Sequence, residues 1–185
     1  MIELASGSGR IVKDFISSGY KIYGIELESE MIDSLKEEYQ KYIYQENIFN
    51  VHKLNKLYQK ADVLILAATS ISLFTEKEFF EFLEKVKSIN KKFKIIFDWV
   101  DPITLTMKSP KRVLMKNGLY YYTNFQLEDK IIYNLYHESS NTLGVSIKVH
   151  HSLNNLVSNL KNVGFKVSIQ EIEDNYYMIE GVIYE

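Results

Sequence analysis

The chain has 185 residues, 46% of them hydrophobic and 14% aromatic, which is enough for one compact domain with its own core. Its charges nearly cancel to −2, which disfavours a nucleic-acid partner, and it has no cysteine, which excludes disulfides and most structural zinc sites, so we expect no metal. No apolar run is long enough to cross a bilayer and no signal-peptide pattern is visible, so we expect a cytoplasmic protein without a membrane partner.

Through residue 99, short apolar runs alternate with segments of helical period, a pattern typical of parallel strands joined by crossover helices. A first strand of little more than Met1 to Leu4 runs into a glycine-containing turn and then a helix. Further strands are expected at Lys21 to Glu26, Ala61 to Ala67 and Phe93 to Asp98, with a weaker one at Lys41 to Gln45.

Two amphipathic helices are expected between these strands, at Ser29 to Tyr39 and at Thr75 to Ile89. Ser29 and Thr75 are the candidate N-caps. Only Thr75 is followed three positions later by a glutamate, Glu78, so only the second helix has the complete capping-box spacing.

The pattern changes after Trp99. Extended segments with polar connections predict an antiparallel sheet, and they span Val113 to Tyr122, Lys130 to Glu138 and Gly144 to His150. A helical pattern then resumes at Ser152 to Asn162, with Gly164 in the position of a C-terminal cap. The last two strands, Phe165 to Ile172 and Tyr176 to Tyr184, are expected to form a hairpin.

These elements predict a single α/β domain over residues 1–185. Residues 1–106 and 151–185 form its core, a Rossmann-like, doubly wound, mostly parallel sheet that ends in a C-terminal antiparallel hairpin. Residues 107–150 are expected to form an inserted antiparallel β cap.

The residues with the strongest chemical signal lie in the turn that follows the first strand. Gly7 and Gly9 lack a Cβ, so a ligand can approach the backbone at the carboxyl end of that strand. Glu26 ends the next strand, where a carboxylate can accept hydrogen bonds from the ribose hydroxyls of a nucleoside. A dinucleotide fingerprint would need a third glycine at position 12, which is Val12.

With Glu3, Ala5, Gly7 and Gly9 in register, the turn resembles the first motif of class I S-adenosylmethionine-dependent methyltransferases, Ala5 standing where that family usually has a glycine. The resemblance continues through Glu26-Leu27, Met31, Asn47-Ile48 and Ala67 to Ser70. It implies S-adenosylmethionine as cofactor and S-adenosylhomocysteine as product.

The resemblance also implies a role for each matching residue. Glu3 positions the methionine amino group, Gly7 and Gly9 underlie the methionyl and ribose portions, and Glu26 holds the ribose hydroxyls. Leu27, Met31 and Ile48 sandwich the adenine, and Asn47 forms a hydrogen bond to its edge. Ala68 and Thr69 line the pocket near the sulfonium. Leu27, Met31 and Ile48 also have a plain interpretation as core residues.

A base is needed only if the acceptor arrives protonated, and the catalytic residue is unknown. Weak candidates are Asp98, His137 and His150, and for His150 and His151 a structural or surface role is the favoured interpretation. A group of tyrosines could form an aromatic acceptor pocket or simply pack in strands: Tyr120, Tyr121, Tyr122, Tyr133 and Tyr136. A group of basic residues could contact an anion or RNA or simply form a solvated face: Lys108, Lys111, Arg112 and Lys116.

The leading hypothesis is in-line methyl transfer to an oxygen or nitrogen of a small molecule. A homodimer is compatible with this hypothesis. Because the first strand is short, we also expect either a chain cut short or an open form that another subunit closes. A cofactor-binding but catalytically incompetent protein or partner subunit is the alternative, and an RNA methyltransferase is a weaker one.

Overall fold

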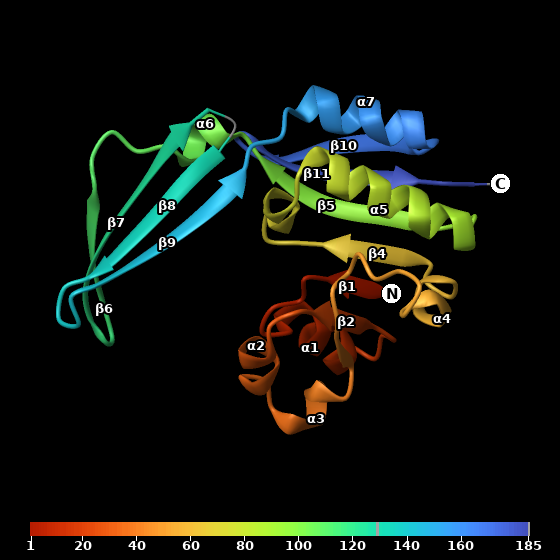
Figure 1. Cartoon of the computed structure of the whole chain (residues 1–185), viewed down its shortest axis with the longest axis horizontal. Coiled ribbons are helices and arrows are strands. Elements are labelled where there is room, and N and C mark those ends of the chain that lie inside the picture. The colour runs from red at the N-terminus through yellow and green to blue at the C-terminus, as the bar shows by residue number, and fades with distance from the viewer. Residues whose placement is uncertain (129, 185) are drawn as a thin grey trace.

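The computed structural model describes residues 1–128 and 130–184, which form a layered core and a projecting cap (Figure 1). The core contains one seven-stranded sheet in the order β10-β11-β5-β4-β1-β2-β3. Its strands are β1 (Ile2–Leu4), β2 (Tyr23–Glu26), β3 (Ile43–Gln45), β4 (Val63–Leu66), β5 (Lys94–Val100), β10 (Lys166–Glu173) and β11 (Tyr176–Val182).

Strands β1 to β5 are mutually parallel, and the hairpin β10–β11 adds to β5 in antiparallel register. The chain builds β2 and β3 on one side of β1 and then crosses to build β4 and β5 on the other. The expected α/β class, mostly parallel sheet and terminal hairpin are therefore confirmed. A strand order that reverses at β1 opens a crevice at the carboxyl ends of β1 and β4, where doubly wound folds bind ligands.

Eight helical segments are described: α1 (Arg10–Ser17), α2 (Ser29–Asp33), α3 (Glu37–Gln40), α4 (Asn55–Tyr58), the 3-10 helix η1 (Ser70–Leu73), α5 (Glu76–Ile89), α6 (Pro102–Leu105) and α7 (Leu153–Val163). Helices α5 and α7 lie side by side against the sheet (Figure 1). Their apolar stripes fill much of the core with the side chains Phe79, Phe82, Leu83, Val86, Leu156, Leu160 and Val163. None of the described helices is long and apolar enough to span a bilayer.

The predicted helix from Ser29 to Tyr39 is wrong in its continuity, because the chain forms α2 and α3 with a break between them. Leu35 lies in that break, is buried, and packs so closely on Gly9 that a Cβ there would come within 2.7 Å of it. Tertiary packing of Leu35 onto the turn thus overrides the helical period. Ser29 is also not an N-cap, since α2 begins at Ser29 and the cap position is Glu28, without a side-chain cap bond.

The cap is a separate four-stranded antiparallel sheet in the order β6-β7-β8-β9, with β6 (Lys111–Met115), β7 (Gly118–Leu127), β8 (Lys130–His137) and β9 (Thr142–Val149). The predicted single strand from Val113 to Tyr122 is wrong, because the chain reverses at Lys116 and Asn117 so that Met115 pairs with Gly118. Gly118, the first residue of β7, has φ +136°, which glycine adopts without strain.

Candidate functional site

The turn between β1 and α1 lies at the sheet crevice and has an unusual backbone. Ala5, Gly7 and Gly9 have φ of 51°, 54° and 63°, in the left-handed region that costs a residue with a Cβ free energy. A Cβ built on Gly7 would have no atom within 4 Å, so this part of the turn faces open space. A ligand could therefore lie directly on the backbone at Gly7.

Glu26 holds this turn in place from the end of β2. Its Oε2 accepts a hydrogen bond from Gly7 N–H at 2.6 Å, and its Oε1 accepts bonds from the N–H groups of Leu27 at 2.9 Å and Glu28 at 3.0 Å. A carboxylate oxygen has two lone pairs, so Oε1 is fully used and Oε2 keeps one. In this arrangement Glu26 can accept one further hydrogen bond.

Glu3 pairs with Gly24 of β2, and Glu26, two residues further along that strand, is close enough that, after burial, its charge contributes to raising the pKa of Glu3. It is buried, and the described residues give its carboxylate one hydrogen bond, from Val12 N–H at 3.2 Å. Burial raises the pKa of Glu3 to about 7, against the lowering effects of that hydrogen bond and of Arg10. A buried carboxyl group with unused acceptor capacity is suited to a cationic partner such as an amino group.

The residues expected around an adenine fall into two groups. Leu27 and Met31 are 54% and 48% exposed, so beyond Glu26 they present apolar surface that the described residues leave uncovered. Ile48 instead belongs to the hydrophobic core. The Asn47 side chain accepts a hydrogen bond from Phe49 N–H through Oδ1, and its NH₂ group has no hydrogen-bond partner among the described residues.

A second strained turn follows β4, next to β1. Ala68 and Thr69 have φ of 56° and 58°, and both carboxylate oxygens of Asp98 accept the Thr69 N–H at 2.9 Å. Asp98 also accepts the Tyr176 hydroxyl at 3.1 Å and is only 3% exposed. Asp98 therefore supports the backbone of the turn, and a ligand would meet Thr69 before it met Asp98.

The cap meets this turn through Lys148 of β9. Its Nζ donates to Thr69 Oγ1 at 3.3 Å and lies 5.3 Å from the centre of the Tyr133 ring. Burial lowers the pKa of Lys148, and the charge of Asp98 opposes this effect. A cavity of about 30 Å³ lies at this junction and is lined by Thr69, Lys148, Tyr133, Trp99, Leu105 and His151 among others. It has room for about two water molecules.

The histidine candidates lie apart from one another. His137 stands at the far end of the cap, where its ring stacks on Tyr120 and contacts Ser139 and Ser140. His150 is half-buried after β9. The structure does not bring His137 to the turns that carry Gly7 and Thr69, because the β8–β9 turn is the part of the cap farthest from the core (Figure 1).

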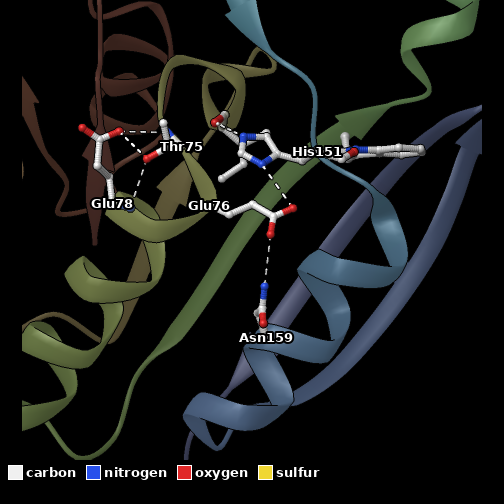
Figure 2. A network of polar contacts seen from close by, with 7 residues as sticks. Thr75, Glu76, Glu78, His151 and Asn159 are labelled. Carbon is white, nitrogen blue, oxygen red and sulfur yellow. Dashed lines mark hydrogen bonds and ion pairs between the residues drawn. The ribbon is translucent and has the colours of Figure 1, made fainter. Parts of the chain in front are cut away.

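His151 is instead a buried joint between cap and core (Figure 2). Its Nε2 contacts the carbonyl of Ile71 at 3.1 Å, and its own carbonyl accepts Trp99 Nε1–H at 2.9 Å. Nδ1 lies 4.0 Å from Glu76 Oε1 and has no hydrogen-bond partner among the described residues. Burial lowers the pKa of His151, which favours the neutral ring.

Sequence reasoning missed Lys148 and Tyr176. The alternation of β9 gives the opposite signal for Lys148, because apolar Val145 and Ile147 would be expected to face the core. In the structure Val145 and Ile147 are exposed, and Lys148 points to the other face, toward the core. The strand register likewise divides the tyrosines, since Tyr133 shares that inner face while Tyr136, three residues on, points to the outer one.

Searches against known proteins identify the fold. No protein-family model and no curated protein matches the sequence. Among solved structures, the chain resembles an S-adenosylmethionine-dependent methyltransferase from Clostridium acetobutylicum, with a TM-score of 0.76 and 12% identity over 100% of this chain and 83% of the other. It also resembles the sugar N-methyltransferase KedS8 from a Streptoalloteichus species, with a TM-score of 0.73 and 13% identity over 100% of this chain and 79% of the other. A third similar structure is CalS10, an amino pentose methyltransferase from Micromonospora echinaspora, with a TM-score of 0.72 and 9% identity over 99% of this chain and 82% of the other. The chain therefore has the fold of class I S-adenosylmethionine-dependent methyltransferases.

Proposed function

We propose that this chain is a methyltransferase that uses S-adenosylmethionine, releases S-adenosylhomocysteine, and methylates an oxygen or nitrogen of a small molecule. The observation that carries the proposal is the arrangement at the switch point, where the open backbone of Gly7, the buried carboxyl of Glu3 and the strand-end carboxylate of Glu26 converge. The solved structures that it resembles include methyltransferases of sugars, which supports a small-molecule acceptor.

The residues present fit this cofactor in four respects. Glu3 offers a carboxylate to the methionine amino group, and Gly7 leaves open space above the turn, whereas Leu35 packs against Gly9. Glu26 has one free lone pair for a ribose hydroxyl. Leu27 and Met31 offer exposed apolar surface to an adenine.

Asn47 offers its free NH₂ group to the edge of that ring, whereas buried Ile48 contributes to the shape of the site from within the core. Ala5, Ala68 and Thr69 set the two turns in the strained backbone that opens the crevice.

When bound, S-adenosylmethionine supplies a methyl group already activated on a sulfonium, so the protein's task is alignment and exclusion of water. Thr69 and the cap residues Lys148 and Tyr133 stand where β4 meets the cap and would position the acceptor. Asp98 fixes the Thr69 turn through its backbone N–H, which makes Asp98 a positioning residue.

The test is calorimetric titration of S-adenosylmethionine and S-adenosylhomocysteine into the wild-type chain, Glu26→Ala and the matched control Glu30→Ala, an exposed glutamate of α2. We expect saturable binding, weakened at least about tenfold in Glu26→Ala because a charge-assisted hydrogen bond is lost, and unchanged in Glu30→Ala. Absence of binding by the folded wild type would refute the proposal. Binding without turnover of any acceptor would favour the cofactor-binding alternative, and salt-dependent RNA binding would favour the RNA enzyme.

A further inference from the structure

The cavity at the junction of cap and core adjoins a wider groove on the inner face of the cap. Tyr133 lines both, which places them next to each other on β8. The groove is formed mainly by apolar and aromatic side chains, including Val113, Met115, Tyr122, Tyr133 and Leu135. A molecule with an apolar body fits such a surface.

Charge along this surface is confined to one end. Among the described residues that line the cavity and the groove, Lys148 is the one lysine, and none is an arginine, aspartate or glutamate. Burial lowers the pKa of His151 and raises that of Tyr133, so both favour their neutral forms. Asp98 is near but only 3% exposed, and its carboxylate already accepts Thr69 N–H and the Tyr176 hydroxyl. The accessible charge is therefore positive.

The ammonium group of Lys148 is poorly satisfied. It has three N–H donors. The described residues give it one long hydrogen bond, to Thr69 Oγ1 at 3.3 Å, and the face of the Tyr133 ring, with no ion pair inside 4.0 Å. A half-buried cation with unused donors, adjoining the turn proposed to lie near the sulfonium, attracts an anionic oxygen and repels a second cation.

We propose that Lys148 determines acceptor specificity: it binds an anionic oxygen of the acceptor, a carboxylate or an ionised acidic hydroxyl, while the acceptor's apolar body lies along the groove against Tyr133 and Tyr122. The role in methyl transfer rests on the proposed function, whereas the anion site itself does not. Amines that carry a positive charge are excluded by like-charge repulsion. An acceptor that arrives as an anion also needs no dedicated base.

Three ring compounds of similar size and different charge test this selectivity: benzoate, benzyl alcohol and benzylamine. Each is titrated at pH 7 and low salt into the full chain, with and without S-adenosylhomocysteine. We expect benzoate to bind at least about tenfold more tightly than benzyl alcohol, and benzylamine to bind more weakly than either. Equal binding of benzoate and benzylamine, or no binding of any of them at millimolar concentration, would overturn the proposal.

Variants assign the preference to Lys148. Lys148→Met keeps the apolar stem and should remove the benzoate preference, Lys148→Arg should keep it, and Lys116→Met, which changes an exposed lysine at the β6–β7 turn, should leave it unchanged. Retention of the preference in folded Lys148→Met would also overturn the proposal. If Lys148→Met does not fold, the comparison of the three compounds on wild type and Lys148→Arg decides. If the wild-type chain binds no S-adenosylhomocysteine but still prefers benzoate, the proposed function is refuted and the anion site is supported.

Discussion

Glu3 and Glu26 are acidic residues on paired strands, and they differ in their hydrogen-bond partners. Glu26 accepts three backbone N–H groups. Glu3 accepts one and is buried, and burial raises its pKa to about 7. The site thus holds one acidic side chain, Glu26, whose hydrogen bonds are committed to the turn, and a second, Glu3, that near pH 7 can lose its proton to gain a cationic partner.

The raised pKa of Glu3 predicts that cofactor binding depends on pH. A group whose folded pKa is above its unfolded value of 4.5 contributes stability that is complete below pH 4.5 and is lost as pH rises through about 7. An amino group binds the ionised form, so affinity for S-adenosylhomocysteine should fall as pH drops below about 7, approaching about tenfold per pH unit.

Calorimetric titrations at several pH values check this slope. Glu3→Gln should flatten it, and Glu38→Gln, which changes an exposed residue of α3, should not. A wild-type affinity that is constant from pH 5.5 to 8 would show that Glu3 does not meet the amino group.

At the level of elements, α5 is the helix whose start the local sequence specifies most fully. Thr75 accepts the N–H of Glu78 at 3.2 Å through its hydroxyl, and Glu78 accepts the N–H of Thr75 at 2.9 Å (Figure 2). The predicted capping box is therefore confirmed. Two residues separate α5 from η1, the 3-10 helix that follows Thr69.

Removal of this cap should destabilise the fold. We expect Thr75→Ala to lower the free energy of unfolding by about 1 kcal/mol, because an orphan helix N–H loses its acceptor. Urea denaturation measures the change. Ser29→Ala is the matched control, since the Ser29 side chain makes no cap bond and its loss should change stability by less than about 0.5 kcal/mol. Equal effects of the two variants would contradict the cap's contribution.

At the level of the whole molecule, the outer face of the cap is unusually apolar. Leu143, Val145 and Ile147 of β9 are 59%, 56% and 59% exposed and alternate along one face, and Phe125 of β7 lies in the same row as Ile147 through Ile132. Exposed apolar patches of this kind mark interaction surfaces. The homodimer considered from the sequence stays a prediction, and this face is where it would form.

Sedimentation equilibrium tests that prediction with a Val145→Lys/Ile147→Lys double variant. We expect the wild-type chain to be dimeric and the variant to be monomeric at the same concentration, because two lysines on a dry interface lose hydration without gaining partners. Thr142→Lys, at an exposed polar position of the same strand, should remain dimeric. A monomeric wild type would exclude this interface.

The sequence by itself determined the α/β class, the order of the core strands along the chain, the capping box, the C-cap at Gly164 (φ +105°) and the turn that carries Gly7 and Gly9. These features are local, because periodicity, caps and turn residues act over a few neighbours. Tertiary structure alone decided that Leu35 breaks its helix to cover Gly9, that Asp98 supports the Thr69 turn, and that Lys148 reaches Thr69 from a strand 79 residues away. Each of these depends on contacts between distant segments, and such contacts form only when the sheet and cap bring those segments together.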